Sequence, residues 1–71
     1  MIGRVVLSVV LDLVVYDGEW DRIHLPPDVL CLVVGEKMAS HSFKWLQLLL
    51  PTGQLVWLYE QEVKERHVVV V

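Results

Sequence analysis

The residues of this chain that could do chemistry are three histidines and one cysteine. His24, His41 and His67 are separated by 17 and 26 residues. This spacing matches neither a zinc site nor a nucleophile motif with a paired base. Cys31 lies within the apolar run 29–34, which favours a buried and inert thiol over a nucleophile. We therefore expect no enzyme, no metal site and no cofactor.

Acidic residues are concentrated in the segment Tyr16 to Pro27. Asp17, Glu19 and Asp21 alternate there around Trp20. The segment lacks the twelve-residue pattern and the closing glutamate of an EF-hand, so calcium binding is disfavoured. It predicts a solvated acidic loop, and the alternative is a loop that binds a basic partner.

The composition limits the kind of protein. With 71 residues, of which 55% are hydrophobic, there is room for one domain, and a domain this small hides only about 60% of its unfolded surface. The longest apolar run, 5–15, is too short for a membrane helix and contains Asp12. The net charge of -3 does not favour non-specific binding to nucleic acid. We expect a soluble, cytoplasmic protein that covers its excess apolar surface by self-association.

The central stretch, Phe43 to Val63, predicts a β-hairpin. Two apolar runs, Phe43 to Leu50 and Gln54 to Tyr59, flank Pro51-Thr52-Gly53, where proline presets φ and glycine tolerates a positive φ. The other expected elements are a strand over Ile2 to Val15, a long loop or splayed hairpin over Tyr16 to Pro27, a strand over Asp28 to Glu36, a polar connector over Glu36 to Ser42, a 3₁₀ turn at Glu60 to Glu62 and a strand over Val63 to Val71.

This order of elements resembles the small barrel of Src-homology-3-like domains. The residues that carry the resemblance are Trp45, Leu48, Gly53, Val56-Trp57-Leu58 and Val63, with Val56 where the family usually has glycine. The resemblance implies an all-β fold: residues 1–71 as a single, strongly bent, five-stranded antiparallel barrel with a 3₁₀ turn before the last strand. It also implies a groove for proline-rich peptides at Tyr16, Trp20, Trp45 and Tyr59. The alternative is that these aromatic residues pack at a subunit interface.

The same strand order is similar to that of Sm-like ring proteins that bind RNA, including divergent ones of phage type. Their N-terminal helix and their Arg-Gly dipeptide have no counterpart here. The candidate RNA contacts are Lys37, His41 and Lys44, with base stacking on Trp20 or Trp45.

The alternation within the hairpin predicts which side chains face the interior. Leu46, Leu48 and Leu50 are expected to point inward with Val56 and Leu58. The opposite face is then apolar too, and soluble monomers rarely expose such a face. The interface residues expected on this face are Leu49, Leu55 and Trp57, and pairing between edge strands of two copies adds Val68, Val69 and Val70. The predicted function is a non-catalytic module that assembles as a homo-oligomer, with a ring as one form, and serves as a structural or protein-binding unit. The alternative is an Sm-like RNA-binding ring.

Overall fold

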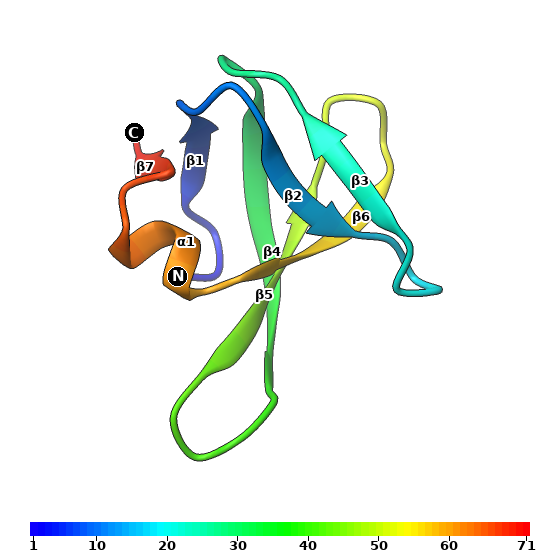
Figure 1. The fold of residues 1–71 in the computed structure, drawn as a ribbon, viewed down its shortest axis with the longest axis vertical. Coiled ribbons are helices and arrows are strands. Elements are labelled where there is room, and N and C mark those ends of the chain that lie inside the picture. Colours follow the sequence, from blue (N-terminus) through cyan, green and yellow to red (C-terminus); the bar gives the residue numbers. More distant parts are fainter.

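The computed structural model describes all 71 residues as one seven-stranded antiparallel sheet with the order β3-β2-β6-β5-β4-β1-β7 (Figure 1). The elements are β1 (Val5–Ser8), β2 (Leu13–Tyr16), β3 (Arg22–Leu25), β4 (Leu30–Met38), β5 (Lys44–Leu49), β6 (Leu55–Tyr59), α1 (Gln61–Lys64) and β7 (Val68–Val70). The two edge strands, β3 and β7, do not pair with each other, so the sheet is open. The one helix, α1, has four residues and is too short to span a membrane.

The β5–β6 hairpin forms where the sequence predicts it. Leu46 lies opposite Leu58 and Leu48 opposite Val56. The turn is closed by hydrogen bonds from the Leu50 N–H to the Gln54 carbonyl and from the Gly53 N–H to the Leu50 carbonyl, both 2.9 Å long. Gly53 has a φ of 90°, a conformation that side chains with a Cβ rarely adopt.

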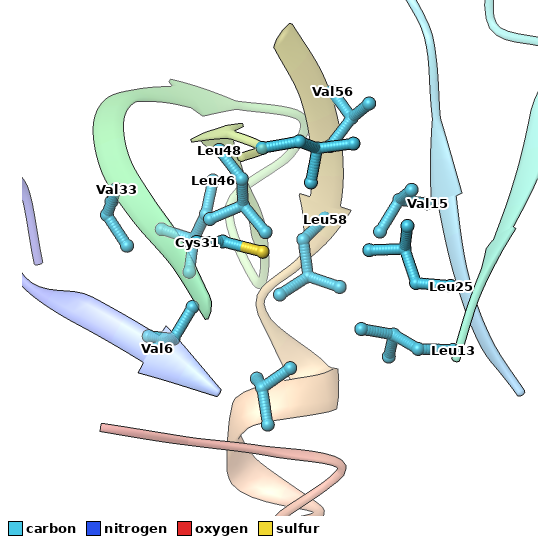
Figure 2. Close-up of a cluster of buried hydrophobic side chains, with 12 residues drawn as sticks. Val6, Leu13, Val15, Leu25, Cys31, Val33, Leu46, Leu48, Val56 and Leu58 are labelled. Carbon is cyan, nitrogen blue, oxygen red and sulfur yellow. The ribbon is translucent and has the colours of Figure 1, made fainter. Parts of the chain in front are cut away.

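The core lies on the concave side of the sheet, where inward-pointing residues of all seven strands meet (Figure 2). Its members are Val6, Leu13, Val15, Leu25, Cys31, Val33, Leu46, Leu48, Leu50, Val56, Leu58 and Val68. The five hairpin residues expected to point inward are all among them. Burial of Cys31 raises the pKa of its thiol, which favours the unreactive protonated form.

The predicted first strand, Ile2 to Val15, is wrong because residues 9–12 separate β1 from β2. Ser8 explains the break. Its hydroxyl donates to the Pro26 carbonyl at 2.8 Å and accepts the Val29 N–H at 2.9 Å. These bonds tie the end of β1 to the segment before β4, so the chain must turn there.

The segment Tyr16 to Pro27 forms a hairpin with a short turn. Strands β2 and β3 pair from Leu13 opposite Leu25 to Tyr16 opposite Arg22. The Asp17 carboxylate accepts the N–H groups of Glu19 and Asp21, at 2.8 and 3.0 Å, and so replaces backbone bonds in the turn. The five-stranded barrel is corrected to an open sheet of seven strands. The expected first strand is divided into β1 and β2, and the segment expected as a long loop or splayed hairpin contributes β3.

The end of the chain is more helical and less extended than predicted. Residues 61–64 form one turn of α-helix instead of a 3₁₀ turn, and β7 covers only Val68–Val70 of the expected strand Val63 to Val71. Arg66 adopts a left-handed conformation with a φ of 62°. This reverses the chain, and the His67 N–H then donates to the Glu62 carbonyl at 2.9 Å.

Candidate binding surfaces

Six aromatic rings gather on the convex side of the sheet around one end of β5 and β6. They belong to Tyr16, Trp20, Phe43, Trp45, Trp57 and Tyr59, and we call them the aromatic surface. Centroids of neighbouring rings lie 4.8 to 6.3 Å apart. Edge-to-face and offset contacts of this kind stabilise aromatic pairs. The four positions expected to line a peptide groove, Tyr16, Trp20, Trp45 and Tyr59, thus lie together.

Trp20 reaches this surface from the β2–β3 turn. It adopts a left-handed conformation with a φ of 64°, which is rare for a bulky side chain. The Trp20 N–H donates to the Asp17 carbonyl at 3.0 Å, while the Asp17 carboxylate holds the two flanking amides. The turn therefore keeps Trp20 in a strained conformation that lays its indole over Trp45 and Trp57.

Lys37 adds one cation to the aromatic surface. An irregularity in the β4–β5 pairing, between Val33 and Gly35, shifts the register so that Lys37 lies opposite Trp45. The Lys37 ammonium lies 5.6 Å from the ring centroid of Trp20 and 6.0 Å from that of Trp57. Both distances are in the range of cation–π attraction.

Lys44 and His41, the other two basic candidates, are arranged differently. The Lys44 ammonium lies 3.4 Å from a Glu36 carboxylate oxygen and 3.5 Å from one of Glu60, and the carboxylate of Glu36 raises the pKa of Lys44. The amine of Met1 donates to Glu36 at 3.1 Å; this bond, together with Lys44, lowers the pKa of Glu36. Lys44 is thus neutralised by the protein's own carboxylates, and His41 is exposed in the β4–β5 loop.

Seven aliphatic side chains form a second surface on the convex side, across five strands. One row follows the register from Val5 through Leu32 and Leu49 to Leu55. A second row runs from Leu30 through Leu7 to Val69 at the edge of the sheet. We call these seven residues the aliphatic face. Leu30, Leu32 and Leu55 are 53%, 37% and 47% exposed, and the other four are half-buried.

The expected interface residues divide between these regions. Leu49, Leu55 and Val69 belong to the aliphatic face, whereas Trp57 stacks beneath Trp20 on the aromatic surface. The Val68 side chain lies in the core, and the Val70 side chain is exposed at the sheet edge.

Four members of the aliphatic face were missed from the sequence: Val5, Leu7, Leu30 and Leu32. Their strands are apolar on both faces, so the alternation did not show which side chains point outward. No member of the face comes from β2 or β3.

No family model matches the sequence, and no curated protein or solved structure is significantly similar to it. The two surfaces must therefore be interpreted from their own geometry and chemistry.

One group of side chains has the donor set of a metal site. Glu62, Glu65 and His67 place one ligand atom each within 4.8 Å of one another. Two carboxylates and an imidazole could hold a divalent cation. In the structure they pair among themselves, with His67 Nδ1 2.6 Å from Glu62 and 3.6 Å from Glu65. The spacing of the histidines alone does not reveal this group in the sequence, because only one of its three ligands is a histidine.

Proposed function

We propose that this protein is a non-catalytic, protein-binding module that works as a homo-oligomer in the cytoplasm. The observation that carries the proposal is the aliphatic face, whose seven side chains remain on the surface after the chain has folded. A contiguous apolar patch of this kind is typical of interaction sites. A second copy of the chain would remove it from water, and each large side chain fully buried contributes about 1.5–3 kcal/mol.

The aromatic surface supports binding of a protein partner in addition to self-association. Within this surface, the Trp20 ring partly covers the other rings. A second copy is therefore less necessary to remove the aromatic surface from water than it is for the aliphatic face. The carboxylates of Asp17, Glu19 and Asp21 lie in the turn that carries Trp20. They suit a partner whose binding segment has basic residues beside the part that contacts the rings.

Substitution of Leu32 tests the self-association. Leu32 lies in the middle of the longer aliphatic row, between Val5 and Leu49. Leu32→Lys places a charge in the contact, so we expect a particle of lower mass than the wild type by light scattering at the same concentration. Leu55→Lys tests the other end of the same row.

Leu11→Lys is the matched control, because Leu11 is 89% exposed in the turn after β1 and lies outside the aliphatic face. It should leave the mass unchanged. A wild-type protein that stays single-copy at every concentration would show that the proposal is wrong.

A second candidate function is binding of single-stranded RNA. The observation that favours it is the parallel arrangement of Trp20 and Trp57, with 19° between their planes, next to the Lys37 ammonium. Rings and a cation in this arrangement can stack on bases and attract phosphate. A titration with short single-stranded RNA at two salt concentrations tests it: affinity that falls steeply with salt supports binding, and none at low salt rejects it.

A further inference from the structure

The two edges of the sheet differ in how they are protected from other strands. Strand β3 carries Arg22 and His24 and is followed directly by two prolines. Charges and prolines at an edge discourage further strand pairing. Strand β7 consists of Val68–Val70 and contains no charged residue and no proline. Figure 1 shows β7 beside β1 on one side only, with the other side open.

The hydrogen bonds to β1 show which backbone groups of β7 are left free. Alternate residues of an antiparallel strand bond to the same neighbour. The Val71 N–H donates to the Val5 carbonyl, and the His67 carbonyl accepts from Val9, at 3.0 and 3.1 Å. Val69 lies midway between residues 67 and 71. Its N–H and C=O groups therefore also point toward β1. The N–H and C=O groups of Val68 and Val70 point away from β1, toward the open side.

We propose that β7 pairs antiparallel with β7 of a second copy, about a twofold axis at Val69. This geometry places Val68 of each copy opposite Val70 of the other. The outward groups of these two residues then form four hydrogen bonds across the axis, two in each reciprocal pair. The proposal rests on the proposed self-association and specifies one of its contacts.

A second copy suits this edge because a twofold contact joins identical segments. Strand β7 carries no charge that would oppose its own copy, and its outward donors and acceptors match each other in the antiparallel register. Val69 also ends the shorter aliphatic row. Pairing at Val69 would place the shorter rows of the two copies, each formed by Leu30, Leu7 and Val69, end to end. They would then form one apolar row across the dimer.

The available area indicates a dimer that dissociates on dilution. A standard interface buries about 800 Å² of each partner. The whole surface of this chain is 4469 Å², so such an interface would take roughly a fifth of it. A strand of three residues with one adjoining row covers less than that, so the edge contact should depend on concentration.

Val70→Pro tests the pairing because it removes an outward donor without touching the bonds to β1. Two of the four cross-axis N–H donors disappear, one from each copy. We expect the dissociation constant for this contact to rise about tenfold or more, seen as a lower mass by sedimentation. Val70→Thr is the matched control, since it keeps the N–H and the branched shape, and should assemble like the wild type.

Hydrogen exchange gives a direct readout of the same bonds. In the wild type, the amides of Val68 and Val70 should exchange about tenfold more slowly at high protein concentration than after dilution, while the Val71 amide, bonded to Val5, should not change. If Val70→Pro fails to fold, Val70→Lys replaces it, because it keeps the donor and places a charge at the edge.

The outcomes separate the two proposals. A lower mass for Val70→Pro with an unchanged Val70→Thr supports the edge pairing. An assembled wild type whose mass Val70→Pro leaves unchanged overturns the edge pairing only, and the aliphatic face remains the contact. A wild type that is single-copy throughout overturns both.

Discussion

The strained conformation of Trp20 leads us to predict that glycine is a less destabilising replacement than alanine at this position, the reverse of the usual order. We expect Trp20→Gly to be more stable than Trp20→Ala by about 1 kcal/mol, because alanine at a φ of 64° retains the clash that glycine avoids. Both variants lose three ring contacts, to Tyr16, Trp45 and Trp57, each worth about 0.5–1.5 kcal/mol. Both variants should therefore have a lower free energy of unfolding than the wild type. For Trp20→Ala the decrease should be roughly 1–4 kcal/mol, because the contributions of neighbouring contacts are not fully additive.

The free energies of unfolding are measured with urea, by far-ultraviolet circular dichroism, so that the loss of an indole does not disturb the signal. Trp57 provides the matched control on a regular strand. There Trp57→Gly should be less stable than Trp57→Ala by about 0.5–1 kcal/mol, since glycine weakens a strand. An alanine variant at position 20 that equals or exceeds the glycine variant would refute the claim that the turn imposes strain.

Two further variants test the fold. Ser8→Ala removes two part-buried hydrogen bonds of the buried Ser8 hydroxyl, to the Pro26 carbonyl and the Val29 N–H, so the free energy of unfolding should fall by about 1–3 kcal/mol, whereas Ser42→Ala in the exposed β4–β5 loop should change it by less than about 0.5 kcal/mol. The folded pKa of Glu36 lies below its ordinary value of 4.5, so its ion pairs stabilise the fold above pH 4.5 and are lost as the pH falls through the folded pKa. Glu36→Gln should therefore flatten the acid side of the stability profile, measured as urea midpoints from pH 7 to pH 3; a profile that stays as steep as the wild type's would show that Glu36 is not responsible.

The sequence predicted the hairpin because its signals were local. Pro51 and Gly53 fix a turn within three residues, and alternation in the flanking strands specifies which leucines are buried. The structure confirms both the turn and the five inward residues. Such a prediction needs no knowledge of what packs against the hairpin.

The first 27 residues were harder because the deciding contacts join distant residues. Nothing in the run 5–15 shows that Ser8 binds Pro26 and Val29, 18 and 21 residues further on. The acidic pattern of Asp17, Glu19 and Asp21 indicated an exposed loop, and the turn that carries them is exposed. The pattern did not show that the Asp17 carboxylate closes a tight turn, and so it could not decide between the long loop and the hairpin.

The position of Trp57 changes where the excess of apolar residues must be covered. From the sequence, Trp57 and the two outward leucines of the hairpin formed one exposed face that only another subunit could bury. In the structure Trp20 stacks on Trp57, and Lys37 lies beside it, so the chain itself covers part of the aromatic end. A charge at position 57 would then damage the hairpin before it tested any interface. The aliphatic face is the apolar surface that still needs to be covered, because no segment of the same chain covers it as Trp20 covers Trp57. A contact with another molecule should therefore be sought at Leu32 and at the edge of β7.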